Sequence, residues 1–233
     1  MAVKPRVRSL LLGLAFVGCT VAESDVATES EPIIGGQIAR EYSSAVLVDS
    51  DRGYCSGAVI APRVVLTAGH CVKGATRWSV TAPFAGSQHA KSTKSWTRYT
   101  PASGIVNPRS IDVAVLVLDS PITLDRYPTV VDTQARPGTK VRNVGRVKNG
   151  VVSNDVLFVG REVALERGLP SGYPNSYVAD QVAESGDSGG PVFDAQDRIV
   201  AVNSGGANGI EVLGRVDLVK ADIDRVVAEN AER

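Results

Sequence analysis

Short apolar runs alternate with turn-forming residues along most of the chain. The runs are rich in Val, Leu, Ile and Ala, and clusters of Gly, Pro, Asn or Ser bound most of them. This spacing is typical of short antiparallel strands in barrels or sandwiches. The strands predicted in this way are Ala45–Val48, Gly57–Ile60, Val64–Thr67, Asp112–Leu118, Gly150–Val152, Asp155–Val159 and Arg198–Val202.

A helical apolar period occurs only near the C-terminal end. Leu218, Ile223 and Val226–Val227 share one face of a helix predicted over about 217–230. Asp217 stands at its start, where an acidic side chain can cap the helix. From residue 33 onward the pattern predicts an all-β body of about 200 residues, as one large domain or two small ones sharing a cleft, followed by one helix.

Residues 1–19 have the pattern of a secretory signal peptide. Three basic residues among the first nine are followed by an apolar run, Leu10–Val17, and by a small residue, Gly18. An eight-residue helix rises only about 12 Å, against about 30 Å of hydrocarbon in a bilayer. The run is therefore too short to span a membrane.

Cys19 follows in a context, Phe16-Val17-Gly18-Cys19, that resembles a bacterial lipobox, although that motif favours Leu where Phe16 stands. The alternative is ordinary signal cleavage nearby, with no lipid on Cys19. Residues 20–32 hold four acidic and no basic side chains, which predicts a solvated acidic tether or pro-segment. The chain is expected to be exported, and either secreted or held at the cell envelope through a lipid on Cys19.

Composition and charge exclude some classes of protein. With 43% hydrophobic residues, the chain can bury a core. Its 25 basic residues are balanced by 25 acidic ones, so it lacks the positive surplus that nucleic-acid binding requires. The two histidines are His70 and His89. His89 lies in a polar stretch and is predicted to be a surface side chain.

Cys55 and Cys71 remain as a pair once Cys19 is set aside. In an exported chain they can form a disulfide, which would stabilise the fold by about 3 kcal/mol in the chain-entropy model. The rival interpretation is a zinc site. Two sulfurs and the adjacent imidazole of His70 leave it short of the usual four ligands, so the disulfide is predicted.

Three short segments carry candidate chemistry. Ser188 stands in the glycine-rich Gly186–Pro191, where a tight turn lets backbone N–H groups approach a substrate. A serine hydroxyl needs a base to become a nucleophile, and His70, at the end of an apolar run, is suited to that task. Asp112 heads another apolar run, and a buried carboxylate there requires a partner such as His70. Taken singly, Ser188 can also lie in a plain hairpin, and Asp112 can be a loop residue that caps a strand.

Together, in the chain order His, Asp, Ser, these segments resemble the trypsin/chymotrypsin-like serine proteases. Ile33-Ile34-Gly35-Gly36 is similar to the mature N-terminus of that family, and Gly186–Pro191 to its serine loop. Cys55-Ser56-Gly57 and Leu66–Cys71 are similar to its histidine loop and disulfide. On this resemblance the chain is identified as a secreted bacterial member of the family.

The resemblance covers about residues 33–228 and implies a fold. Two six-stranded antiparallel β-barrels are expected, over about 33–130 and about 131–216, with the active site between them. A C-terminal helix is expected to follow over about 217–230.

The resemblance also implies roles for individual residues. Ser188 is the implied nucleophile, His70 the base and then the acid, and Asp112 the carboxylate that orients the imidazole. The N–H groups of Gly186 and Ser188 are the implied oxyanion donors.

Activation is implied to follow cleavage of a precursor before Ile33. The new α-amino group of Ile33 would then pair with Asp187. Because Pro32 precedes this bond and trypsin-like enzymes do not cut after proline, a separate activating peptidase is expected.

The position of the specificity residue depends on register. Counting back from Ser188 places Val182 at the base of the substrate pocket, which favours an apolar or small side chain. A register with a longer loop places Asp180 there, which favours Arg or Lys. Ser204-Gly205-Gly206 is expected to form the wall along which substrate pairs as an extra strand, and a further alignment brings Glu211 near the pocket.

A secreted serine endopeptidase is thus the predicted function. A protease-like binding module without activity is the alternative from another class. The expected partners are a polypeptide substrate and an activating peptidase, with no nucleic acid, metal or cofactor, and the chain is expected to be a monomer.

Overall fold

The computed structural model describes Met1 and residues 36–102, 107–207 and 209–231. The apolar leader segment, Cys19, the acidic segment 20–32 and Ile33 lie outside these residues. The described residues from 36 onward belong to one unit of the chain. Within the described part, no helix combines the length and the apolar character that crossing a membrane requires.

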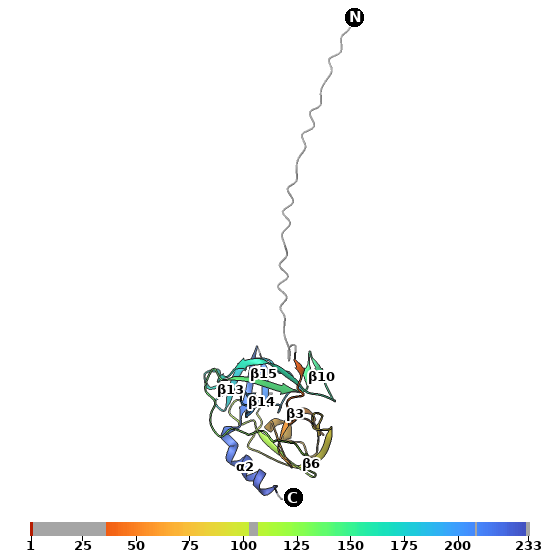
Figure 1. The fold of residues 1–233 in the computed structure, drawn as a ribbon. Coiled ribbons are helices and arrows are strands. Elements are labelled where there is room, and N and C mark those ends of the chain that lie inside the picture. Colours follow the sequence, from red (N-terminus) through yellow and green to blue (C-terminus); the bar gives the residue numbers. More distant parts are fainter. Residues whose placement is uncertain (2–35, 103–106, 208, 232–233) are drawn as a thin grey trace. The chain divides into compact units, whose positions relative to one another are not determined.

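The first half of the body is a closed barrel, seen around β3 and β6 in Figure 1. Its six strands pair antiparallel in the order β2-β3-β4-β7-β6-β5. The short helix α1 (Gly69–Val72) follows β4 directly. The strands are β2 (Ala45–Ser50), β3 (Gly53–Ala61), β4 (Val64–Thr67), β5 (Trp78–Ala82), β6 (Gln88–Thr97) and β7 (Ala114–Leu118).

Strand β2 is apolar at consecutive positions because both of its faces are buried. Val46 and Val48 belong to the cluster that fills the barrel. Ala45 and Leu47, which point to the opposite face, belong to a cluster shared with the second sheet. Full burial stabilises each Val or Leu side chain by roughly 1.5–3 kcal/mol. The apolar runs of the sequence therefore hold the two halves of the body together.

The second half is an eight-stranded antiparallel sheet in the order β1-β11-β8-β14-β15-β16-β13-β12. A small hairpin, β9 (Val147–Lys148) with β10 (Val151–Val152), follows β8. The strands of the sheet are β1 (Gln37–Ile38), β8 (Lys140–Gly145), β11 (Phe158–Ala164), β12 (Glu166–Arg167), β13 (Ser176–Asp180), β14 (Pro191–Asp194), β15 (Ile199–Ala207) and β16 (Ile210–Arg215).

The predicted all-β class is confirmed, and the first barrel has the predicted six strands. The second sheet is a half-barrel instead of a closed barrel. Strands β11 and β13 approach each other. Among the described residues, however, the outer edge of β11 pairs with β1 and that of β13 pairs with β12. The edges that would close a barrel are thus occupied.

One predicted strand is displaced along the chain. The interval Asp155–Val159 was expected to be extended, whereas β11 begins at Phe158. The hydroxyl of Ser153 accepts hydrogen bonds from the backbone N–H groups of Asp155 at 3.2 Å and Val156 at 3.0 Å. This local turn competes with the strand, as serine side chains commonly do.

The predicted C-terminal helix is present as α2 (Lys220–Glu229), at the lower end of the body in Figure 1. A short 3₁₀ turn, η2 (Asp217–Val219), precedes it. Ile223 and Val226 are buried, as their period predicts. The expected cap is wrong, because the carboxylate of Asp217 pairs with the guanidinium of Arg215 at 2.5 Å and makes no capping bond.

Candidate active site

Strand pairing brings His70 to Asp112. Strand β4 leads into α1, which carries His70, and β4 pairs with β7, which follows Asp112. Asp112 is 1% exposed. Its Oδ1 accepts the backbone N–H of His70 at 2.8 Å, and its Oδ2 lies 2.7 Å from Nδ1 of the ring. Since a carboxylate only accepts, Nδ1 carries the hydrogen and Nε2 keeps a free lone pair.

Ser204 is a further partner of Asp112. Its hydroxyl donates to Oδ2 of Asp112 at 2.5 Å, and the side chain is buried. Ser204 lies where the register of β15 against β16 shifts, between Asn203 and Gly205. Such bulges re-aim side chains beside active sites. The sequence placed Ser204 only in the wall of the substrate channel.

The disulfide lies beside both the imidazole of His70 and the serine loop. The sulfur of Cys71 is 3.7 Å from Nε2 of His70 and 3.7 Å from the carbonyl oxygen of Ser188. That carbonyl also accepts the N–H of Ser56 at 2.7 Å. The serine loop is thus fixed against β3, next to the histidine.

Glycine is required at Gly189 for this approach. Its φ is +80°, and a Cβ there would lie 2.1 Å from Oγ1 of Thr67 and 2.4 Å from the carbonyl oxygen of Ser56. Any larger residue would push the serine loop away from β3 and β4.

The predicted disulfide between Cys55 and Cys71 is confirmed, with Cα atoms 6.3 Å apart. Sulfurs bonded to each other are not thiolates, so the zinc alternative is wrong. The bond joins β3 to α1 and so restrains the helix that carries His70.

Asp187, the residue before Ser188, is fully buried. Its Oδ1 accepts the N–H of Val147 at 2.8 Å, and its Oδ2 accepts the N–H of Glu184 at 2.8 Å. Burial raises its pKa to about 7. Gly145 makes room for this carboxylate, because a Cβ there would lie 2.2 Å from Oδ1. Its predicted partner, Ile33, lies outside the described residues.

Gly186 has a φ of +119°, a backbone conformation that other residues rarely adopt. Its carbonyl oxygen accepts the hydroxyl of Ser56 at 3.3 Å. Both Gly186 and Ser188 are therefore held through their carbonyl groups by Ser56 of β3.

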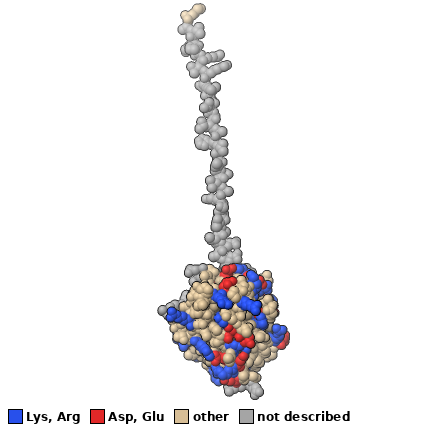
Figure 2. Space-filling view, turned by 90° about the vertical axis from the view of Figure 1, so that its left-hand side faces the viewer, with Lys and Arg blue, Asp and Glu red and all other residues tan. Residues whose placement is uncertain are grey.

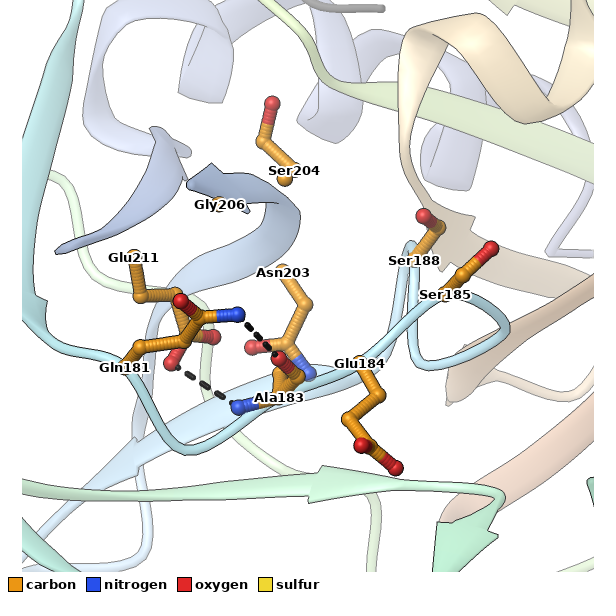
Figure 3. Close-up of a pocket in the computed structure, with 10 residues that line it drawn as sticks. Gln181, Ala183, Glu184, Ser185, Ser188, Asn203, Ser204, Gly206 and Glu211 are labelled. Carbon is orange, nitrogen blue, oxygen red and sulfur yellow. Dashed lines mark hydrogen bonds between the residues drawn. The ribbon is translucent and has the colours of Figure 1, made fainter. Parts of the chain in front are cut away.

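A pocket with a cavity volume of about 140 Å³ opens beside Ser188. Figure 3 shows Ser188 and Ser185 at one end and Gln181 and Glu211 at the other. Ser204, Gly205 and Gly206 line it, as the sequence predicts for the substrate wall.

The sequence profile of the family described as Trypsin matches residues 33–220. The chain belongs to the trypsin family.

Curated relatives and solved structures agree with this family assignment. Coagulation factor IX of Oryctolagus cuniculus is 27% identical over 203 residues, which cover 75% of this chain and 74% of the relative. Trypsin I-P1 of Gallus gallus is 26% identical, over 78% of this chain and 82% of the relative. A solved structure of human heparin binding protein matches with a TM-score of 0.67 at 19% identity, covering 83% of this chain and 96% of that one. That last likeness concerns the fold.

Neither Val182 nor Asp180 lines the pocket of this trypsin-family chain, so both predicted registers are corrected. Val182 is 1% exposed, and its Cβ lies 3.6 Å from where a Cβ on Gly160 would stand. Asp180 ends β13 and is exposed, with its carboxylate 3.7 Å from the guanidinium of Arg161. After Asp180, the N–H of Gln181 still donates to the carbonyl oxygen of Gly209 at 3.0 Å, and it is Gln181 and Ala183 that line the pocket, which a count of residues back from Ser188 does not reveal.

Glu211 is an acidic residue that lines the pocket at the end away from Ser188. It stands inside an apolar run, Ile210–Leu213, the same signal that marked Asp112. Burial raises its pKa to about 7. The sequence placed it near the pocket only by alignment.

Arg146 is a second residue of the site region that the sequence did not single out. It is fully buried, and its guanidinium donates to Asp49 at 2.5 Å and to the carbonyl oxygens of Ser153 and Cys55 at 2.8 and 3.2 Å. It thus ties the hairpin beside the serine loop to the first barrel. An arginine after Gly145 carries no sequence signal for burial.

His89 lies on β6, exposed, with its ring nitrogens near the hydroxyls of Ser79 and Thr81. This agrees with the predicted surface position. Of the two histidines, His70 is the one that the fold brings to the site.

Proposed function

We propose that this trypsin-family protein is a serine endopeptidase that cleaves peptide bonds through an acyl-enzyme on Ser188. The observation that carries the proposal is the 2.7 Å contact between Nδ1 of His70 and Asp112, which leaves Nε2 directed to the side where Cys71 and Ser188 lie. The matched family and its protease relatives support the same reaction class.

In the proposed reaction, Nε2 of His70 takes the proton from the hydroxyl of Ser188 as Oγ attacks the scissile carbonyl carbon. The carbonyl oxygen becomes an oxyanion, which the N–H groups of Gly186 and Ser188 stabilise. Protonated His70 then gives its proton to the leaving amine as the C–N bond breaks. Water, deprotonated by His70, attacks the acyl-enzyme, and the proton returns to Ser188 as the acid product leaves.

Asp112 stabilises the imidazolium that forms in both steps. It is buried and accepts from three donors, namely the backbone and Nδ1 of His70 and the hydroxyl of Ser204. Its orientation is therefore fixed before the substrate arrives, and little reorganisation accompanies the reaction.

Activation is proposed to follow cleavage before Ile33 by a separate peptidase. This peptidase would remove the pro-segment and release Glu31-Pro32 last, as a dipeptide. Asp187 is a buried carboxylate, and among the described residues only backbone N–H groups hold it. The α-amino group of Ile33 would supply the missing positive charge. N-terminal sequencing of the active species should read Ile-Ile-Gly-Gly, and any other start would contradict this route.

Export follows from the leader pattern, and a lipid on Cys19 is the proposed anchor of a precursor. Cleavage before Ile33 would free the catalytic body, since the disulfide lies within the body. We expect the processed protein to be a monomer. Bacterial origin stays a prediction.

A binding module without activity is the second candidate. It is favoured by one observation, the structural likeness to human heparin binding protein. A fluorophosphonate probe decides between the two. Labelling of the processed protein that disappears in Ser188→Ala supports the enzyme, whereas correctly processed protein that takes up no label supports the binding module.

A further inference from the structure

Three polar side chains are buried in the second sheet, one each on β8, β15 and β16. Asn143, Asn203 and Glu211 are 0%, 2% and 1% exposed. Alternate residues of a strand face the same side of the sheet. The residues two positions along each strand are apolar and buried, namely Val141, Ala201 and Leu213. An apolar residue is therefore the expected choice at each of the three places.

The three side chains form one hydrogen-bonded network. Nδ2 of Asn143 donates to Oδ1 of Asn203 at 2.9 Å and to Oε1 of Glu211 at 2.6 Å. Oδ1 of Asn143 is buried and has no hydrogen-bond partner within the part of the chain that the structure describes. Because an unpaired buried carbonyl oxygen is costly, stability alone does not explain why asparagine stands there.

The network holds the first end of the loop 182–190. Oε2 of Glu211 accepts the backbone N–H groups of Val182 at 3.0 Å and of Ala183 at 3.2 Å. Figure 3 shows Glu211 and Asn203 beside the segment that leads from Gln181 to Ser188. The start of the loop is thus fixed to β16.

The network also holds the second end of the loop, through Asn203. Nδ2 of Asn203 donates to the carbonyl oxygen of Asp187 at 3.3 Å. The backbone of Asn203 accepts the N–H of Gly189 at 2.7 Å and donates to the carbonyl oxygen of Gly190 at 2.9 Å. Since Asn143 binds both Asn203 and Glu211, one amide group links the two ends of the loop.

We propose that Asn143 is a positioning residue for the oxyanion donors, and this inference rests on the proposed endopeptidase function. Through Asn203 and Glu211 it fixes both ends of the loop 182–190, so that the N–H groups of Gly186 and Ser188 point to one place. The loop contains no cysteine, so no disulfide can do this. A displacement of about 1 Å at a reacting centre can cost about 100-fold in rate, so the position of the loop matters for the reaction.

Asn143 is the member of the network that can be changed without altering the surface of the pocket. Asn203 and Glu211 line the pocket beside Ser188, whereas Asn143 is not among the residues that line it. A substitution of Asn143 therefore tests the position of the loop separately from contacts with the substrate side chain.

The test compares Asn143→Leu with Val80→Ala. Leucine is similar in size to asparagine but cannot donate, so Asn203 and Glu211 lose their shared donor. Val80 is fully buried in the cluster that fills the first barrel, and Val80→Ala is the control for a loss of stability away from the loop. Urea unfolding in a Ser188→Ala background measures the stability of both variants.

Processed wild-type and variant proteins are assayed on a peptide that the wild type cleaves. We expect Asn143→Leu to lower kcat by about 100-fold with little change in KM, because the donors act on the transition state. Val80→Ala should retain the wild-type kcat and KM.

A peptide aldehyde and the matching peptide alcohol, both with the acyl part of that substrate, give a second measurement that a loss of stability would not produce. Oγ of Ser188 bonds to the aldehyde carbon, its proton goes to Nε2 of His70, and the aldehyde oxygen becomes an oxyanion. The alcohol occupies the same pocket without forming this bond. Asn143→Leu should weaken inhibition by the aldehyde and leave inhibition by the alcohol unchanged.

Asn143→Ser keeps one donor and should lose less kcat, and it decides the case if Asn143→Leu does not fold. The proposal is overturned if each folded variant of Asn143 retains the wild-type kcat, if Val80→Ala loses as much, or if inhibition by the aldehyde and the alcohol weakens alike. Processed wild type that takes up no fluorophosphonate and cleaves no peptide would instead reject the proposed function, on which this inference rests.

Discussion

Asp112 and Glu211 are both acids inside apolar runs, and the structure gives them different surroundings. Asp112 faces the imidazole of His70, which can become its counter-charge. Glu211 faces a pocket and neutral donors. The sequence signal is the same for both, because an isolated acid in a strand shows only that the carboxylate is buried. Its partner depends on which strands lie beside it.

Asp112→Asn should lower kcat by about 10⁴-fold, the scale of the same change in the template serine-protease triad, with a small change in KM. The amide cannot accept from both the backbone and Nδ1 of His70 in the present arrangement, so the ring adopts the tautomer with hydrogen on Nε2. It then cannot take the proton of Ser188. Steady-state kinetics with a Lys-containing peptide measure the effect.

Ser204→Ala is the companion variant, since it removes one donor to Asp112 and leaves the tautomer unchanged. Its kcat should fall far less than that of Asp112→Asn. Equal losses of kcat in the two variants would indicate that Asp112 acts mainly through its hydrogen bond with Ser204 and not through the tautomer of His70.

Because Glu211 lines the pocket beside Ser188, the relative rate of cleavage of a peptide that places Lys in this pocket should depend on pH. Burial raises the pKa of this carboxyl to about 7, so it is neutral below that pH and charged above it. The ratio of kcat/KM for Lys to that for Leu should therefore rise as the pH increases through about 7. Because titration of the triad affects both substrates alike, the ratio isolates Glu211. The nearby acids Asp187 and Glu184 change the midpoint of this rise but not its direction.

The matched control is Glu211→Gln, whose ratio should be flat between pH 5.5 and 8.5. A wild-type ratio that is constant over this range would contradict the assignment of the pH dependence to Glu211.

At the scale of elements, the sequence predicts the strands that carry complete apolar runs and misplaces those with polar ends. Strands β2 and β4 were anticipated because both faces of each are buried. Strand β11 was displaced by the turn that Ser153 forms. The serine loop was anticipated from its glycines, and the structure adds that Ser56 of β3 holds it in place.

Replacing both cysteines, Cys55→Ala with Cys71→Ala, should lower the free energy of unfolding by about 3 kcal/mol. The bond closes a segment with a sequence separation of 16 and restrains α1. Urea unfolding of the protein in a Ser188→Ala background, which prevents self-cleavage, measures the loss. The rate of fluorophosphonate labelling in the Ser188 background should fall as well, because the sulfur of Cys71 lies close to both the ring of His70 and the carbonyl group of Ser188. An unchanged labelling rate would show that the disulfide stabilises the fold but does not position His70 for the reaction.

At the scale of the whole molecule, charged side chains are dispersed on the surface, and only a few charged residues among the described part of the chain are buried. Basic and acidic side chains are interspersed on the face seen in Figure 2, in agreement with 25 of each in the sequence. The buried acids Asp187 and Glu211 both have a pKa raised by burial to about 7. The carboxyl groups of an unfolded chain titrate near pH 4.

Stability of the precursor should therefore fall as the pH rises from about 4 to about 7. In this window the folded state binds more protons than the unfolded state, so the free energy of unfolding decreases with pH. Urea midpoints of the Ser188→Ala precursor should be higher at pH 5.5 than at pH 8. Adding Glu211→Gln should flatten the profile, and so should cleavage before Ile33, whose amino group would pair with Asp187. A urea midpoint that rises with pH would contradict the interpretation that these acids are buried without a cation.

The sequence by itself determined the all-β class, the disulfide and the three side chains of the candidate triad. These features depend on local signals, namely apolar runs, glycine-rich turns and acids or histidines at the ends of strands. Only the tertiary structure decided that β11 and β13 leave the second barrel half closed, that Ser204 donates to Asp112, and that Glu211 closes the pocket. The reason is physical: hydrogen bonds across strands join residues far apart in the chain, and a bulge or turn of one residue changes which side chain points into the cavity.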